Sequence, residues 1–524
     1  MLRTTRSSRR RLTGLALLTV ATVALTGCTF GGDGDSSSDE LADAIEAVTG
    51  LERYANSGFS ILVQDLETGD TLYEHDAATP LVPGSTQKNF TTATALDVLG
   101  VDTIIETPVH AVGTVSGGVL DGDLALVGGG DFSFGLRDQP DGTLAYTAFD
   151  HNEANAGLPA TLVDGDPLAA LRDLAQQIVD AGVREVRGDV IVDNRLFEPF
   201  EEWPDGRIDA IWLNENVLDV AITPGEVGAA PDVELRPSLT SIQFVNEATT
   251  VADGDTQLTV TDAGGGRFVL TGQIAASDEP TRRTAEIEDP PAFARMAFRE
   301  VLADAGVTVT SDAGAANAAD RLPASYAGEP IAVWESATTA ERVKVVQKVS
   351  YNRGAQLFAC LIAVEGGSTD CADGLGRIIE LLTELGVPEG SVFLFDPAGS
   401  IDYNRASAMA HVTVLRAAVD TEWGEAWHDA LPIAGVDGSM STQGKGTSSE
   451  GKIQAKTGTR GVDYPAGGSI LFAGQAFAGY ATTDDGRELV FTSIMNTVEV
   501  HSFEELVEII TELGGIPLAV QQHG

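Results

Sequence analysis

The sequence predicts an α+β fold in which both ends of the chain supply strands to one antiparallel sheet. Two strand-like runs near the start, 59–63 and 71–73, flank a turn that contains glycine, which predicts a β-hairpin. Three strand-like runs follow near the other end, at 452–457, 477–483 and 489–495, and a tight turn joins the last two. Since antiparallel sheets are readily built from such hairpins, we expect one domain assembled from the two ends.

Runs with the apolar spacing of helices accompany these strands. One run, 41–51, precedes the hairpin, and another, 504–513, closes the chain. Two more, 90–99 and 342–349, lie between the groups of strands. Helices and strands grouped in this way are typical of the α+β class.

The middle of the chain has a different composition. The chain has six lysines, at 88, 344, 348, 445, 452 and 456, so none falls between 89 and 343. This stretch is rich in Gly, Asp and Ala and contains short strand patterns such as 188–193 and 257–260. We expect a β-rich insertion at 105–325 within a domain formed by 41–104 and 326–524, although the scarcity of lysine could alone produce the gap.

The charge is strongly acidic. The 524 residues include 32 Lys and Arg against 78 Asp and Glu, a formal charge of -46, with 43% hydrophobic residues. The hydrophobic content indicates a globular protein. The charge excludes nucleic acid and anionic lipid surfaces as partners bound through a general field. A solvated acidic surface explains it better than a patch made for a cationic partner.

The first residues form a targeting segment. Five arginines lie among residues 3–11, an apolar run follows at 12–26, and small residues precede Cys28, the pattern of a signal peptide at 1–27. Leu25-Thr26-Gly27-Cys28 resembles the bacterial lipobox, which implies an exported protein held at the outer face of the cell membrane by lipid on Cys28. The alternatives are an ordinary signal peptide and a short membrane anchor. Residues 28–40 are then expected to form a flexible tether.

Two cysteines remain after Cys28. Cys360 and Cys371 are eleven positions apart, and in an oxidising compartment they can form a disulfide; the alternative is two reduced cysteines, with Cys360 in an apolar core. The seven histidines have no spacing typical of a metal site, and no phosphate-binding loop is present. We therefore expect neither a metal nor another cofactor.

The first chemical motif is Ser85-Thr86-Gln87-Lys88 after Pro83-Gly84. Pro-Gly before a serine is typical of a helix start, and residues i and i+3 share a helix face, so Ser85 and Lys88 can touch. A serine becomes a strong nucleophile when a neighbouring base removes its proton, and a lysine with a lowered pKa can be that base.

Two more motifs follow, Ser350-Tyr351-Asn352 and Lys456-Thr457-Gly458-Thr459. The first means little alone, because serine and asparagine often cap helices. In the second, the glycine permits close approach of a substrate, while the lysine and the hydroxyls can bind a carboxylate. Two of only six lysines, Lys88 and Lys456, lie in the three motifs.

Together, Ser-x-x-Lys, Ser-x-Asn and Lys-Thr-Gly in this order resemble the signature of β-lactamases and penicillin-binding proteins. The long gap between Ser85 and Ser350 is similar to that of the D-alanyl-D-alanine carboxypeptidases of the class C low-molecular-mass penicillin-binding proteins, over nearly the whole mature chain. The resemblance implies a β-lactamase/transpeptidase-like domain, an antiparallel sheet with helices on both faces, carrying a large insertion.

The resemblance also implies the roles of the site residues. Ser85 would form an acyl-enzyme, Lys88 would take its proton, Ser350 would pass a proton to the leaving amine, and Asn352 would hold the substrate and Lys88. The backbone N–H groups of Ser85 and Thr459 would form an oxyanion hole, and Lys456, Thr457 and Thr459 would bind the terminal carboxylate beside Gly458. The implied partners are peptidoglycan stem peptides ending in D-Ala-D-Ala, with β-lactams as covalent inhibitors.

Alternatives within this resemblance are an added endopeptidase activity, a β-lactamase or esterase on the same scaffold, and an inactive wall-binding lipoprotein. The sequence departs from the family pattern at Tyr351, at Asp396-Pro397-Ala398-Gly399, at Gln443, and in about fifteen extra residues at 460–474. The extra residues follow the Lys-Thr-Gly motif directly, so they are expected to border the site.

Overall fold

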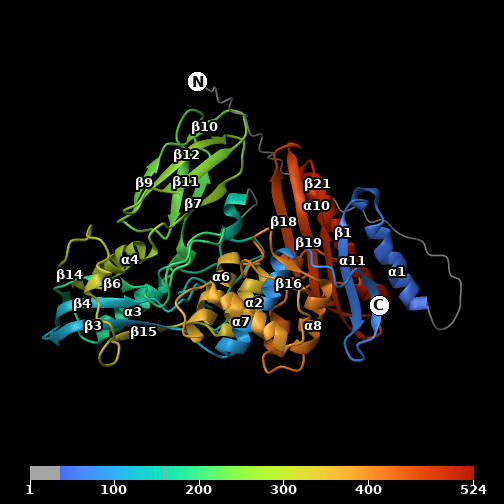
Figure 1. Cartoon of the computed structure of the whole chain (residues 1–524). Helices are drawn as coiled ribbons and strands as arrows, with labels where there is room; N and C mark the ends of the chain where they lie inside the picture. The colour runs from blue at the N-terminus through green and yellow to red at the C-terminus, as the bar shows by residue number, and fades with distance from the viewer. Residues whose placement is uncertain (1–35, 148, 157–159) are drawn as a thin grey trace, which may run out of the picture.

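The computed structural model describes residues 36–147, 149–156 and 160–524 and has the α+β architecture that the sequence predicts (Figure 1). Its main sheet joins the two ends of the chain in the antiparallel order β18-β19-β20-β1-β2, and β21 also pairs with β19. The predicted hairpin and C-terminal strands are confirmed. The strands are β1 Gly58–Asp65, β2 Thr71–His75, β18 Ile453–Tyr464, β19 Ser469–Thr482, β20 Glu488–Asn496 and β21 Val498–Val500.

Helices cover both faces of this sheet because its strands are apolar on both sides. In β1, Ile61 and Val63 belong to one core and Leu62 to the other, as the alternation of strand side chains requires. The first core is completed by α1 Ser36–Thr49, α10 Phe503–Leu513 and α11 Gly515–His523.

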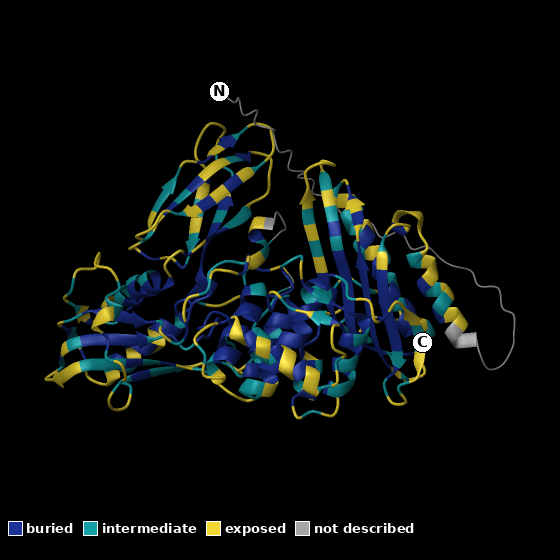
Figure 2. Ribbon diagram, in the orientation of Figure 1, coloured by how far each residue is buried: buried dark blue, intermediate teal, exposed yellow. Residues whose placement is uncertain are grey.

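The opposite face carries a group of helices packed around α2. Helix α2 is buried from Lys88 to Leu96, and dark blue marks the buried interior of this group in Figure 2. Helix α8 packs on β1 and β20, while α5 and α6 pack on α2. The helices of this group are α2 Lys88–Leu99, α5 Thr339–Lys348, α6 Asn352–Glu365, α7 Asp373–Glu384, α8 Ala408–Ala418 and α9 Gly424–Ala430. A short ladder of β16 Val392–Phe393 and β17 Arg405–Ala406 lies between α7 and α8 in the sequence.

The residues between these elements form further sheets around a core of their own (Figure 1). One sheet has the order β14-β5-β4-β3-β15 with β6 on β4, another is β13-β7-β8, and β12 lies among β9, β10 and β11. The strands are β3 Glu106–Ser116, β4 Val119–Val127, β5 Glu185–Val186, β6 Val190–Asp193, β7 Val217–Thr223, β8 Asp232–Arg236, β9 Gln243–Asn246, β10 Thr249–Val251, β11 Gln257–Asp262, β12 Arg267–Ala275, β13 Thr281–Glu286, β14 Thr308–Val309 and β15 Ala332–Glu335, with helices α3 Ala169–Asp180 and α4 Pro290–Asp304.

The division of the chain at residues 104 and 325 stays a prediction. Strand β15 lies after the second of these positions, yet it pairs with β3, with Glu335 opposite Glu106. The sheet of the inserted part therefore continues to residue 335.

The start of the chain needs one correction. The predicted tether extends to residue 40, but α1 already begins at Ser36. Asp39 lies in the first turn of this helix, where its negative charge favours the helix dipole. The predicted signal peptide and Cys28 lie outside the described residues. Within those residues, no helix combines the length and the hydropathy that crossing a membrane requires.

The extra residues at 460–474 extend two strands of the main sheet. Strands β18 and β19 continue past the predicted ends and pair as far as Tyr464 opposite Ser469, with a register shift after Arg460. Strand β21 pairs with the far side of this extension at residues 470–472. The extension stands at the upper end of the sheet in Figure 1.

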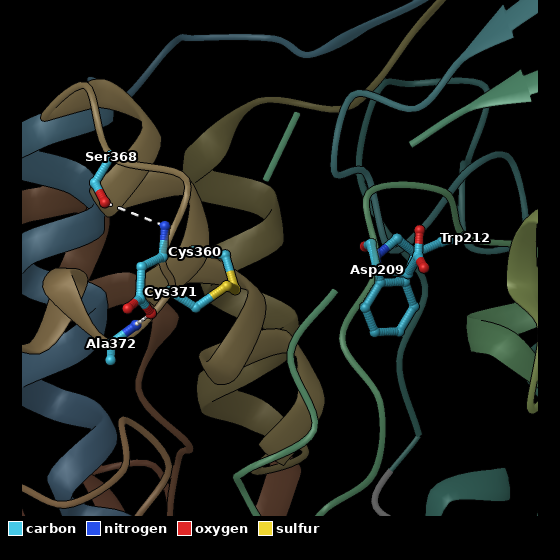
Figure 3. Close-up of a disulfide and its surroundings, with 7 residues drawn as sticks. Asp209, Trp212, Cys360, Ser368, Cys371 and Ala372 are labelled. Atoms are coloured by element: carbon cyan, nitrogen blue, oxygen red, sulfur yellow. Dashed lines mark hydrogen bonds between the residues drawn. A yellow bond between two sulfur atoms is a disulfide. The ribbon is translucent and has the colours of Figure 1, made fainter. Parts of the chain in front are cut away.

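A disulfide joins Cys360 of α6 to Cys371, which lies just before α7 (Figure 3). Both cysteines are fully buried in the core around α2. The bond therefore closes the connection between two adjacent helices that pack against each other.

Candidate active site

Ser85 lies in a tight turn that leads directly into α2. A 3-10 turn at Gly84–Gln87 precedes Lys88, the first residue of the helix, and Gly84 has a positive φ of 53° that favours glycine. One turn of helix brings the two motif side chains together, and Lys88 Nζ donates a hydrogen bond to Ser85 Oγ at 2.8 Å. The predicted contact between serine and lysine is present.

Lys88 is fully buried and has two other acceptors. Its Nζ donates to Asn352 Oδ1 at 2.6 Å and to the carbonyl oxygen of Ala398 at 2.7 Å. Burial disfavours the ammonium and lowers the pKa of Lys88 to about 8, while the charges of Asp205, Asp396 and Glu153 oppose this decrease. A substantial fraction of Lys88 is therefore a neutral amine near pH 8.

Ser350 occupies the connection between α5 and α6 with a φ of 59°, an uncommon conformation for a residue with a side chain. Its Oγ accepts a hydrogen bond from Lys456 Nζ at 2.9 Å. Lys456 also donates to the carbonyl oxygen of Thr457 at 2.8 Å and is fully buried. Burial, together with the nearby charge of Lys88, lowers the pKa of Lys456 well below its ordinary value.

Gly458 permits β18 to lie directly against the turn that holds Ser85. A Cβ atom at this position would lie 2.2 Å from the carbonyl oxygen of Pro83 and 3.1 Å from the backbone nitrogen of Ser85. A Cβ atom at Gly84 would in turn lie 2.8 Å from the backbone nitrogen of Thr459. Glycine at both positions thus brings the backbones of the first and third motifs together.

The two threonines of the third motif hydrogen-bond to neighbouring side chains. Thr457 Oγ1 donates to Ser439 Oγ at 2.7 Å, and Thr459 Oγ1 donates to Gln475 Oε1 at 2.9 Å. The structure thus brings the three motifs to one place, and two groups of hydrogen bonds form around their lysines. Lys88 connects the Ser85 side to Asn352, and Lys456 connects Ser350 to the β18 strand.

Two supporting carboxylates were not predicted. Asp205 comes from the inserted part, and its side chain accepts from Asn352 Nδ2 at 2.8 Å and from Gln356 Nε2 at 2.7 Å. Asp396, fully buried, accepts from the backbone nitrogens of Ala398 and Gly399 at 2.6 and 2.7 Å. It thereby orders the turn whose carbonyl oxygen binds Lys88. Asp205 has no recognisable sequence signal, whereas Asp396 lies in the Asp-Pro-Ala-Gly segment noted above.

A buried ionic cluster lies in the inserted part, close to α6. Arg137 is paired with Glu215 and with Asp150, and His151 lies between Glu215, at 3.0 Å, and Asp219, at 3.1 Å. Burial alone would lower the pKa of His151, but the two carboxylates raise it to about 10. Arg353 of α6 donates to the backbone oxygen of Glu215, so this cluster fixes the inserted part against the helix that begins at Asn352.

In the described part of the chain, no group of His, Cys, Asp and Glu side chains is arranged to hold a metal ion.

An antiparallel sheet covered by helices on both faces, with Ser–Lys, Ser–Asn and Lys–Thr–Gly elements converging on one serine, defines the class of penicillin-recognising serine enzymes. The chain belongs to the D-Ala-D-Ala carboxypeptidase 3 (S13) family, whose family model matches residues 41–513. The predicted family and the serine peptidase class are therefore confirmed.

Similar proteins agree with this assignment. A D-alanyl-D-alanine carboxypeptidase of Actinomadura sp. (strain R39) is 28% identical, with 92% of this chain and 83% of that protein covered. The D-alanyl-D-alanine carboxypeptidase DacB of Haemophilus influenzae is 23% identical, with coverage of 85% and 86%. The crystal structure of penicillin binding protein 4 (dacB) from Haemophilus influenzae has the same fold, with a TM-score of 0.67 at 18% identity over 90% of this chain and 98% of that chain.

Proposed function

We propose that this enzyme removes the terminal residue from peptidoglycan stem peptides ending in D-Ala-D-Ala, through an acyl-enzyme on Ser85. The observation that carries this proposal is the hydrogen bond from the buried Lys88 to Ser85 Oγ, combined with a pKa of about 8 for Lys88. Together they provide a nucleophile and a base that can be neutral at the moment of reaction.

In the acylation step, neutral Lys88 takes the proton of Ser85 while Oγ attacks the carbonyl carbon of the scissile peptide bond. The resulting oxyanion lies between the backbone N–H groups of Ser85 and Thr459, which the close packing at Gly84 and Gly458 brings near each other. The C–N bond then breaks as Ser350 Oγ passes its proton to the leaving amine, and the proton held by Lys88 replaces it, which leaves Lys88 neutral again. In deacylation, Lys88 takes a proton from the attacking water and returns it to Ser85 Oγ as the ester bond breaks.

Lys456 and the hydroxyls of Thr457 and Thr459 bind the carboxylate of the leaving residue. Lys456 is fully buried with a lowered pKa, so an incoming carboxylate supplies the counter-charge that favours its ammonium form. This requirement for a negative end explains selectivity for a C-terminal residue. A β-lactam with its own carboxylate satisfies the same contacts, and we propose that it acylates Ser85 and remains bound.

The decisive experiment is mass spectrometry of the purified protein after incubation with benzylpenicillin, beside Ser85→Ala. The expected result is one adduct, carried by the peptide that contains Ser85 and absent from the variant. Release of D-alanine from a peptide ending in D-Ala-D-Ala separates a carboxypeptidase from a β-lactamase, which would instead release penicilloate rapidly. Absence of any adduct would favour an inactive wall-binding protein.

We further propose export and attachment to the outer face of the cell membrane through lipid on Cys28. The arginine-rich start, the apolar run and the lipobox-like Leu25-Thr26-Gly27-Cys28 support this proposal. Incorporation of labelled palmitate into the full-length chain, and its loss in Cys28→Ala, would test it.

A further inference from the structure

The extended strand β18 offers an open edge beyond the reactive serine. Strand β18 is the last strand in the order of the main sheet and pairs with β19 on one side. From Thr457 to Tyr464, no strand in the described ranges pairs with its other side. Residues Gly461 and Asp463 of this stretch are exposed.

The alternation of strand backbone identifies which groups face this open edge. In the proposed function, the N–H of Thr459 points toward the substrate, and it therefore faces away from β19. After Arg460 the pairing register shifts because β19 contains one extra residue, Ala473, which has no partner on β18. The backbone groups of β18 therefore continue to alternate between its two edges without interruption. The N–H and C=O groups of Gly461 and Asp463 therefore face the same edge as those of Thr459.

The direction of a bound peptide follows from the same contacts. Its carboxylate lies at Lys456 and its scissile carbonyl lies at Thr459, so the residues on its N-terminal side continue past Gly461 toward Asp463. Such a peptide is antiparallel to β18. At about 3.3 Å per residue, Asp463 lies about 13 Å beyond Thr459.

The base of the extension is held in place. Arg460 Nε donates to Asp402 Oδ1 at 2.5 Å, which ties the strand to the loop between β16 and β17. On the other side, β21 pairs with residues 470–472 of β19. A strand supported on both sides in this way is preorganised to accept a further strand.

We propose that Gly461 and Asp463 bind the N-terminal part of the substrate as an added β-strand. The enzyme then selects substrates that have a long, extended chain on the N-terminal side of the scissile bond over substrates in which this chain is short. This inference rests on the proposed function, since it takes the direction of the peptide from the proposed contacts of Thr459 and Lys456. The occupant is the substrate itself, because the edge is continuous with the strand that binds the scissile bond.

The test measures kcat/KM for D-alanine release from acetylated peptides ending in D-Ala-D-Ala that carry zero, two or four further residues before the terminal pair. In the unaltered protein, kcat/KM is expected to rise about 3- to 10-fold with each added pair of residues, the gain typical of one or two net hydrogen bonds. A value independent of length would overturn the inference and leave the proposed function intact. No release from any of the peptides would overturn both.

Proline substitutions then locate the contact. Gly461→Pro and Asp463→Pro each remove one outward N–H and leave the pairing with β19, because proline is tolerated on edge strands. Asp463→Pro is expected to abolish the gain from the last two residues, and Gly461→Pro the gain from the first two as well. Ala466→Pro, in the exposed turn of the same hairpin, is the matched control and should keep the length dependence.

Thermal unfolding followed by circular dichroism checks that the variants are folded. An unchanged length dependence in both folded proline variants at residues 461 and 463 would overturn the inference. A loss of the length dependence in Ala466→Pro as well would also contradict it, because the effect would then belong to the hairpin as a whole.

Discussion

The Nδ2 atom of Asn352, at the start of α6, donates a hydrogen bond at 2.8 Å to Asp205, which lies between β6 and β7 in the sequence. Because a carboxylate can only accept, this contact fixes the orientation of the amide and directs Asn352 Oδ1 toward Lys88. Asp205 is itself held by Gln356, one helical turn further along α6. The inserted part thus positions a group that touches the base.

Removing this carboxylate is expected to slow acylation. In Asp205→Ala, the amide of Asn352 loses a charge-assisted partner, and the second-order rate of acylation by benzylpenicillin should fall about 10- to 100-fold. Asp205→Asn, which still accepts through its own oxygen, should lose less. Glu202→Ala, an exposed carboxylate of the same loop, is the control. Equal rates in Asp205→Ala and the unaltered protein would show that the contact has no effect on Lys88.

The rate of acylation is expected to increase with pH. The amine of Lys88 must be neutral to accept a proton, and with a pKa of about 8 the neutral fraction at pH 7 is about one tenth. The rate should therefore rise about fivefold between pH 7 and 8 and level off above pH 9. Stopped-flow acylation across this range measures it. A rate that is constant from pH 6 to 9 would exclude Lys88 as a base with this pKa.

Replacing Lys88 by arginine tests the same role by a different route. The guanidinium keeps its proton at every accessible pH, so Lys88→Arg should lose acylation by at least about 10²-fold. Mass spectrometry of the adduct at fixed times gives the rate. Lys445→Arg, at an exposed lysine outside the three motifs, serves as the control.

The disulfide should stabilise the helices packed around α2. Closing a loop of this length contributes about 3 kcal/mol by the loop-entropy estimate. The double variant Cys360→Ala with Cys371→Ala should therefore unfold at lower denaturant concentration. Addition of a reductant should lower the midpoint of the unaltered protein and not that of the variant. A midpoint that is the same with and without the cysteines would contradict this prediction.

The ionic cluster predicts a pH dependence of stability. The folded pKa of His151, about 10, lies above the ordinary histidine value, so its stabilising contribution is complete below about pH 6.5 and is lost as the pH rises through 10. The free energy of unfolding should decrease between pH 7 and 10. Glu215→Gln leaves Arg137 and His151 with one carboxylate fewer, and it should cost about 3–5 kcal/mol and weaken that decrease. Urea unfolding at several pH values measures both effects.

The three motifs could be predicted because each consists of neighbouring residues whose spacing is meaningful. Ser85 and Lys88 are separated by one helical turn, and Lys456 to Thr459 lie on one strand, so local geometry already brings their groups together. Asp205 could not be predicted, since only the packing of the inserted part on α6 brings it to Asn352. The positive φ of Ser350 could not be predicted either, because serine is not a residue type that indicates a positive φ.

The ends of β18 and β19 differ from the prediction for a similar reason. Residues 460–474 include several glycines and a proline, which are typical of loops. Only residues 465–468 form a turn, and the residues on either side of it pair as strands because the sheet and β21 supply partners. Likewise, the tether appeared to continue to residue 40 because its serines and acidic residues resemble a linker. Asp39, one of these acidic residues, instead lies in the first turn of α1.

The main sheet has a consequence for the order of folding. Strand β1 lies between β2 and β20, and Gly58 pairs with Asn496, so this sheet cannot close until almost the whole chain has emerged. The inserted part has its own core, and its contacting residues are closer together in the sequence than those of the main sheet, so it can fold earlier. In a chain that ends before β20, the inserted part would therefore be folded, while the apolar hairpin of β1 and β2 would lack the strand that pairs with β1. Such a form would be prone to aggregation and proteolysis.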